Sequence, residues 1–175
     1  AIRVFKKEMK ELIDNNPSIW KEMGIRSSEE VDEIVLTSAT ELEFWVKTPD
    51  DIADREQLAT SQSMKEQYWK RTVGPVRTAL EKTLRILDYY GFEVEMGHKE
   101  VGGVKAKLVG SGAAYDHIME QLEIDWKYSE ALQAADNEAQ VKNVVKDIFR
   151  YNGLDVTFQA KPIEKVAGNG EHTHL

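Results

Sequence analysis

The sequence contains no cysteine, so it can form no disulfide framework and offers no thiolate for catalysis. It also has no charged-then-apolar leader and no apolar run long enough to span a bilayer, which predicts a protein without a membrane partner. The absence of cysteine suits a reducing compartment, and we therefore expect a cytoplasmic protein.

The sequence also has fewer positively charged than negatively charged residues. The chain has 23 Lys and Arg residues against 31 Asp and Glu residues, which gives a net charge of −8 at pH 7. Because an acidic surface repels a phosphate backbone, we expect no nucleic-acid partner. The length of 175 residues and a hydrophobic content of 41% are sufficient for one domain with a real core.

The clearest local pattern lies at residues 40–46, where Leu42, Phe44 and Val46 alternate with polar or charged neighbours. A period of two predicts a strand with one apolar face, and it sends Glu41 and Glu43 to the other face. Two carboxylates on one strand face repel each other unless a cation lies between them. A solvated strand face is the plain alternative, because exposed sheet faces often carry glutamate.

The same alternation recurs further along the chain and is interleaved with amphipathic helical segments. Strands are predicted at 92–96, 101–109, 117–128 and 154–160, and a further one begins at 171. One long helix is predicted to start near Pro75, and another has Ser129 as its N-cap. We therefore predict an α+β fold, in which a curved antiparallel sheet carries helices packed on its outer face.

Acidic residues occupy the polar face of several predicted strands, and a histidine near the end of the chain completes the series. They are Glu41, Glu43, Glu95, Glu100, Glu123 and His172. If these faces converge, the carboxylates need a counter-charge, and a divalent cation such as Mg²⁺ or Mn²⁺ is the natural one. Spacing alone does not show convergence, and His172 and His174 could equally be a pair of surface histidines.

Five blocks in order give this pattern a context. They are T-E-L-E-F-W (40–45), V-E-M-G-H-K-E-V (94–101), L-E-I-D-W-K-Y-S-E-A-L-Q-A-A-D-N (122–137), V-T-F-Q-A-K-P (156–162) and A-G-N-G-E-H-T-H (167–174). They resemble the E-x-E-F, V-E-x-x-H-H-E-V, H-E-I-D-F-R-Y-x-x-A-L-x-A-A-D-N, A-T-F-M-x-K-P and G-S-G-x-H-x-H blocks of the glutamine synthetase catalytic domain. The resemblance covers about residues 35–175. It implies that residues 1–175 are the N-terminal part of such a domain, truncated before its C-terminal half and lacking the family's β-grasp domain.

The resemblance implies a two-metal site that binds Mg²⁺ or Mn²⁺, with ATP as co-substrate. Its first metal would be held by Glu43, Glu100 and Glu123, and its second by Glu41 and His172. It further implies nucleotide contacts from Glu95, Tyr128 and His174, and a backbone contact between Gly168 and the substrate glutamate. No residue is assigned as a catalytic acid or base.

The sequence departs from the family pattern between Glu100 and Glu123, where the gap is longer than usual. We predict an inserted hairpin over Val101 to Met119, turning at Gly110-Ser111-Gly112, which returns Glu123 beside Glu100. Counting without an insertion would instead put Leu108 in the ligand position. The match of the E-I-D-W-K-Y block favours the insertion.

The implied reaction is ATP-dependent ligation of ammonia to glutamate through a γ-glutamyl phosphate, which places the protein in nitrogen metabolism. Ala167 stands where many members have an asparagine near the glutamate, so a γ-glutamyl-amine (polyamine) ligase stays open. A non-catalytic nucleotide-binding relative is the third interpretation. The resemblance implies a large homo-oligomeric ring, and we expect the chain by itself to be inactive, because the family's arginines and last metal-binding glutamate follow the final block.

Overall fold

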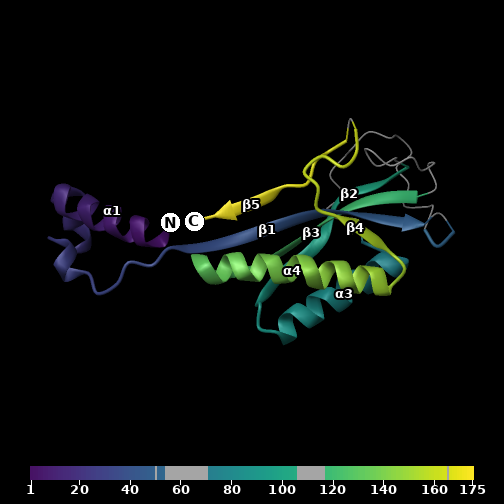
Figure 1. The fold of residues 1–175 in the computed structure, drawn as a ribbon, viewed down its shortest axis with the longest axis horizontal. Helices are drawn as coiled ribbons and strands as arrows, with labels where there is room; N and C mark the ends of the chain where they lie inside the picture. Colours follow the sequence, from purple (N-terminus) through teal and green to yellow (C-terminus); the bar gives the residue numbers. More distant parts are fainter. Residues whose placement is uncertain (50, 54–70, 106–116, 165) are drawn as a thin grey trace.

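In the computed structural model, the described residues are 1–49, 51–53, 71–105, 117–164 and 166–175. The helices and strands follow one another in a mixed order (Figure 1). They are α1 (Ile2–Asn15), α2 (Pro17–Trp20), the 3₁₀ turns η1 (Lys21–Met23) and η2 (Ser28–Glu30), β1 (Thr37–Pro49), α3 (Gly74–Tyr89), β2 (Val94–Lys105), β3 (His117–Glu130), α4 (Ala131–Tyr151), β4 (Asp155–Thr157) and β5 (Glu171–His174).

The strands form one antiparallel sheet in the order β2-β3-β1-β4, with β5 also paired to β1. Both short strands, β4 and β5, lie along the same edge of β1, opposite residues 45–47 and 39–42. Helices α3 and α4 cover one face of the sheet, while α1 and α2 lie at one end of the molecule (Figure 1). The predicted α+β fold with an antiparallel sheet and helices on one face is confirmed.

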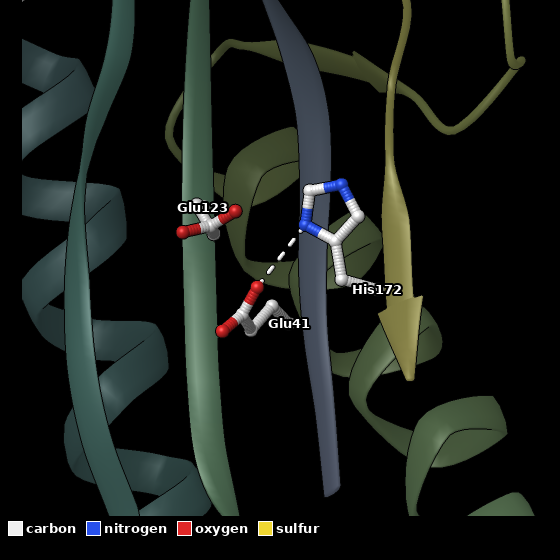
Figure 2. A group of neighbouring side chains, drawn as sticks. All are labelled: Glu41, Glu123 and His172. Carbon is white, nitrogen blue, oxygen red and sulfur yellow. Dashed lines mark hydrogen bonds and ion pairs between the residues drawn. The ribbon is translucent and has the colours of Figure 1, made fainter. Parts of the chain in front are cut away.

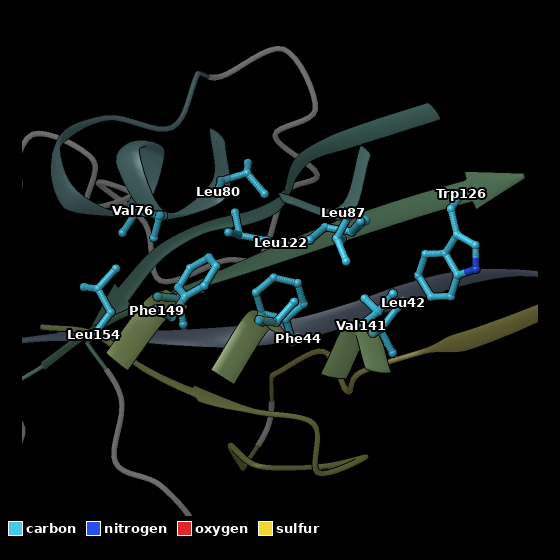
Figure 3. Packing of buried hydrophobic residues seen from close by; sticks show 14 of the residues in the cluster. Leu42, Phe44, Val76, Leu80, Leu87, Leu122, Trp126, Val141, Phe149 and Leu154 are labelled. Carbon is cyan, nitrogen blue, oxygen red and sulfur yellow. The ribbon is translucent and has the colours of Figure 1, made fainter. Parts of the chain in front are cut away.

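The main core lies between the sheet and the α3–α4 layer. It contains the apolar face of β1, namely Leu42, Phe44 and Val46, as the alternation predicts. Phe44 packs edge-on against Phe149 of α4, with ring centroids 5.5 Å apart (Figure 3). Because these side chains are withdrawn from water on one face only, the opposite face of the sheet is left for polar groups.

That opposite face is not wholly polar. Trp45 is fully buried there, in a second cluster with Val101, Met119 and Ile163. Its indole Nε1 donates a hydrogen bond to the backbone oxygen of Ala167, 3.2 Å away. This cluster packs the segment after β4 onto the sheet and bounds the polar region at one end.

Strand β2 is irregular in three places, which periodicity did not predict, and the third of them lies between Val101 and Val104. The register against β3 shifts between Val94 and Met96, so that Met96 lies opposite Asp125 and is 53% exposed instead of facing the core. It shifts again between Lys99 and Val101, where Glu100 is the additional residue. Each shift reverses the inward and outward alternation beyond it.

The β2–β3 hairpin brings the chain back as predicted. Val104 and Lys105 pair with Met119 and Ile118, so the two strands pair in antiparallel as the arms of a hairpin. The predicted turn at 110–112 and Leu108 lie outside the described residues.

Helix α4 begins one residue later than predicted, with Glu130 at the N-cap and Ser129 still in β3. Strand β4 is also shorter than its predicted span. None of the helices in the described part of the chain combines the length and hydropathy needed to cross a membrane.

Candidate metal centre

Acidic side chains gather on the sheet face that α3 and α4 leave uncovered. The register places Glu41 opposite Asp125 and Glu43 opposite Glu123 across β1 and β3. On the other side of β3, His98 of β2 is the partner of Glu123. Paired residues of an antiparallel ladder share a face, so β1, β2 and β3 contribute to one polar surface.

One group of possible metal ligands combines three strands. Glu41, Glu123 and His172 each offer a ligand atom, and these atoms lie within 4.8 Å of one another (Figure 2). His172 Nδ1 is 3.1 Å from Glu41 Oε2, and His174 Nε2 is 2.9 Å from Glu41 Oε1. The short strand β5 therefore presents both histidines to the same carboxylate.

A second group lies one strand further across the sheet. His98, Glu100 and Glu123 also place ligand atoms within 4.8 Å of one another. His98 Nδ1 is 3.5 Å from Glu100 Oε1, and His98 Nε2 is 3.2 Å from Glu123 Oε1. Glu123 thus belongs to both groups, and it is nearly buried between them.

The charges of this face perturb two of its members. The hydrogen bond to Glu123 raises the pKa of His98 to about 9, although burial opposes this shift. Burial raises the pKa of Asp125 to about 6, and the neighbouring charge of Glu123 adds to that rise. Imidazolium at position 98 thus supplies positive charge that the crowded carboxylates require.

Glu43 occupies a different environment from the one its sequence motif implies. Its ligand atoms belong to neither group. Instead, Glu43 Oε2 accepts hydrogen bonds from the backbone N–H of Gly170, at 2.6 Å, and from Nε2 of Gln121, at 2.9 Å. The expectation that Glu43 binds a metal with Glu100 and Glu123 stays a prediction.

The glycine segment before β5 is fastened to the sheet at the same point. Gln121 Nε2 also donates to the backbone oxygen of Gly168, at 2.8 Å, so one buried amide holds both Glu43 and this segment. A Cβ on Gly168 would collide with the backbone oxygen of Ala160. Only glycine allows this close approach, and the predicted contact of Gly168 with glutamate stays untested.

The three residues expected near a nucleotide lie around the edge of this polar face. Glu95 is exposed at the first register shift of β2. Tyr128 is 67% exposed near the end of β3, and the side chain of His174 is hydrogen-bonded to Glu41. The structure brings only His174 into direct contact with the acidic groups, and the nucleotide assignment of all three remains a prediction.

The donor set fits a hard divalent cation. Carboxylate oxygens with one imidazole nitrogen are ligands that Mg²⁺ and Mn²⁺ accept. In addition, Oδ1 of Asp125 is buried without a hydrogen-bond partner among the described residues, although a buried acceptor is costly when unpaired. The strands that carry the ligands are paired over most of their length, so their spacing is fixed by the sheet.

The sequence patterns did not assign two residues that the structure places at the centre. His98 received no role from the sequence, yet it joins Glu100 and Glu123. Gln121 also lies two residues before Glu123 on the same strand face, and this spacing was the available signal. Neither the hydrogen bonds of Gln121 nor the position of the β2 bulge follows from periodicity.

Comparisons with known proteins identify the family of the chain. The profile of the family described as "Glutamine synthetase, catalytic domain" matches residues 25–175. That match covers most of the chain, and the chain therefore belongs to the glutamine synthetase catalytic-domain family.

Individual relatives match shorter stretches. Glutamine synthetase of Thermus thermophilus is 45% identical over 85 residues, covering 49% of this chain and 16% of that protein. Glutamate–isopropylamine ligase of a Pseudomonas species is 42% identical over 70 residues, covering 40% of this chain and 15% of that protein.

Among solved structures, the one titled "Apo GmaS without ligand" aligns with a TM-score of 0.56 and 25% identity, over 79% of this chain and 29% of that one. The cryo-EM structure of Plasmodium falciparum glutamine synthetase aligns with a TM-score of 0.56 and 20% identity, over 92% of this chain and 32% of that one, which supports the fold alone. The chain spans less than a third of the length of these solved proteins.

Proposed function

We propose that the whole protein is an ATP-dependent ligase that joins ammonia to glutamate through a γ-glutamyl phosphate and so makes glutamine. Family membership and the sequence match to glutamine synthetases support this proposal. We further propose Mg²⁺ or Mn²⁺ as the metal, a large homo-oligomeric assembly, and a cytoplasmic location.

One observation carries the proposal: Glu123 is shared by two three-residue groups on adjacent paired strands of one sheet face. A carboxylate between two cation positions suits a two-metal site. Glu41 and His172 would complete one position, and His98 or Glu100 the other. Glu43, which the family pattern also implies, would need to change its hydrogen bonds to join them.

The chemical difficulty of the reaction lies in its charges. A nucleotide triphosphate and the carboxylate of glutamate repel each other, and the repulsion must be neutralised before the carboxylate oxygen can attack the γ-phosphorus and displace ADP. When bound, divalent cations would supply Lewis-acid neutralisation of the phosphate oxygens. The ammonia then attacks the acyl carbon of the γ-glutamyl phosphate, phosphate leaves, and the attacking nitrogen loses a proton.

The described residues have separate tasks in this proposal. Glu41, Glu123 and His172 would hold the cation position nearest to β5, and His174 would position Glu41. Gln121 holds the segment around Gly168, whose backbone would orient the substrate glutamate. Glu95 and Tyr128 would contact the nucleotide from the edge of the site.

The test is phosphate release by the whole protein, supplied with ATP, Mg²⁺, glutamate and ammonia. We expect release to require glutamate, to be accompanied by glutamine, and to be lost in Glu123→Gln. Glu81→Gln is the matched control, because Glu81 lies on α3 and pairs with Arg77. Absence of glutamate-dependent phosphate release in the wild type contradicts the proposal.

A larger amine is the alternative acceptor. The match to glutamate–isopropylamine ligase and the alanine at position 167 favour testing it. The same assay with isopropylamine or a polyamine in place of ammonia separates the two. A much higher kcat/KM with the larger amine identifies a γ-glutamyl-amine ligase, and binding of ATP without any turnover identifies a non-catalytic relative.

A further inference from the structure

A lysine and a glutamate are buried together on the helix-facing side of the sheet, beneath the metal centre. Lys99 is 1% exposed and Glu120 is 6% exposed. The ammonium group of Lys99 donates a hydrogen bond to Oε1 of Glu120. Because desolvating two charges is costly, such a pair is weak evidence of stabilisation, and its burial calls for a second cause.

The pair stands beside the second irregularity of β2. Lys99 lies opposite Leu122 of β3, but the next paired residue is Val101, opposite Gln121. Glu100 is therefore the bulged residue. Consequently two successive side chains reach the same face, Glu100 beside His98 and Val101 in the cluster with Trp45.

The position of this bulge decides which side chain faces the metal centre. If the irregularity moved one residue toward the start of β2, Glu100 would take the place of Lys99 opposite Leu122 and would face the apolar core, because the strand alternates with a period of two. A charged side chain can be buried on the helix side of the sheet only if it pairs with an opposite charge. Glu120 supplies a negative charge there, so it stabilises a buried lysine and would repel a buried glutamate.

We propose that Lys99 and Glu120 are positioning residues that fix the β2 bulge and thereby aim Glu100 at Glu123. This inference rests on the proposed metal site. It is supported by two coincident departures from the family blocks quoted above. Lys99 stands at the second histidine of H-H-E, and its strand partner Leu122 stands at the histidine of H-E-I-D.

The test replaces both charges with apolar groups of similar size, Lys99→Met together with Glu120→Leu, in the whole protein. A double replacement removes both members of this pair together, so neither is left as an unpaired buried charge and the protein should still fold. Mn²⁺ binding is followed by electron paramagnetic resonance. We expect the affinity at the Glu100 position to fall about tenfold, the usual size for losing a residue that orients a ligand.

Two variants separate the loss of orientation from a general loss of stability and from the loss of charge. Val145→Ala opens a cavity in the same core and should lower the melting temperature without weakening Mn²⁺ binding. Lys99→Arg retains the charge and should keep the wild-type affinity. If the double variant does not fold, Glu120→Gln is measured in its place, with a smaller loss of roughly threefold expected because some orientation by hydrogen bonding survives.

Wild-type Mn²⁺ affinity in the double variant, or in Glu120→Gln where that is used, overturns the inference. A crystal structure of the same variant gives an independent readout that does not depend on metal. A bulge still at Glu100 overturns the inference, and a displaced bulge supports it. If the wild type itself binds no Mn²⁺, the proposed metal site fails, and the crystal structure of the variant alone decides the role of Lys99 and Glu120.

Discussion

His98 and Glu123 are partners across β2 and β3, and the Nε2 of His98 lies 3.2 Å from Oε1 of Glu123. This contact raises the pKa of His98 to about 9, so the imidazole is protonated at neutral pH. A cation that binds Glu123 therefore competes with a positive charge already present. Proton and metal share one carboxylate, and their competition should be visible in solution.

The apparent affinity for Mn²⁺ should rise as the pH increases from 7 to about 9. While His98 holds a proton, metal binding must displace either the proton or the imidazolium. If one proton is released, the gain is roughly tenfold per pH unit. Isothermal titration with Mn²⁺ in buffers of different ionisation enthalpy measures both affinity and released protons.

His98→Asn is the informative variant for this competition. It should bind Mn²⁺ more tightly than the wild type at pH 7 and should lose most of the pH dependence. Weaker binding by His98→Asn at both pH 7 and pH 9 would instead identify His98 as a direct ligand.

The free energy of unfolding of the metal-free protein should fall as the pH rises and His98 loses its proton, whereas the Mn²⁺ affinity should rise. The pKa of His98 is raised from 6.5 to about 9 in the folded state, so its contribution to stability is full below pH 6.5 and is lost as the pH rises through about 9. Asp125 contributes in the same way at lower pH: its pKa is raised from 3.8 to about 6, so its contribution to stability is full below pH 3.8 and is lost as the pH rises through about 6. Urea unfolding in EDTA between pH 6 and 9 should show a falling free energy of unfolding, and His98→Asn should flatten the curve above pH 6.5.

Replacing Glu123 should weaken both metal positions together. Glu123→Gln removes the ligand common to the two groups, whereas Glu41→Gln removes a ligand from only one. Mn²⁺ titration should therefore show no tight site in Glu123→Gln and one remaining site in Glu41→Gln. Equal loss in the two variants would mean that the two groups do not act as separate positions.

The glycines before β5 allow a paired experiment. A Cβ at Gly168 would collide with a backbone oxygen, so Gly168→Ala should lower the free energy of unfolding by about 1–3 kcal/mol. A Cβ at Gly170 would meet the side chain of His172 at 2.7 Å, which can rotate away. Gly170→Ala should therefore cost less stability but weaken Mn²⁺ binding through His172.

Each glycine variant is the control for the other, with urea unfolding and Mn²⁺ titration as the two measurements. Greater destabilisation by Gly170→Ala than by Gly168→Ala would contradict this expectation. It would show that the backbone at Ala160 moves to make room for the added Cβ of residue 168.

Periodicity was sufficient for the fold because a half-buried strand must alternate. Leu42 and Phe44 could be assigned to the core, and Glu41 to the open face, because one face of β1 meets the helices. Met96 could not be assigned, because a register shift of one residue leaves no trace in hydropathy. The start of α4 was displaced for a similar reason, since Ser129 and Glu130 are both acceptable at a strand end.

The candidate site was predictable as a set of acids but not as a geometry. Short motifs indicated Glu123 and His172, and the hairpin that returns Glu123 beside Glu100 followed from matching the E-I-D block. The division of these residues into two groups of possible metal ligands could not be predicted from the sequence, because it depends on which carboxylate oxygen accepts which hydrogen bond. Glu43 is the clearest case, since its contact with Gly170 joins residues 127 positions apart.

The 175 residues alone should make no glutamine. The described part of the site face carries carboxylates and histidines, while Arg77 and Arg85 belong to α3, on the other side of the sheet. Charge developing on a transferred phosphoryl group needs cationic donors aimed at it. The ligands are also open to water, with side chains 57% exposed at His172 and 36% at Glu41, which weakens their electrostatic effect.

A coupled assay of the isolated chain with ATP, Mg²⁺, glutamate and ammonia should give background phosphate release, while Mn²⁺ titration of the same sample still detects weak binding. Glutamine formation at an ordinary enzymatic rate, abolished by Glu123→Gln, would show that these residues suffice for catalysis.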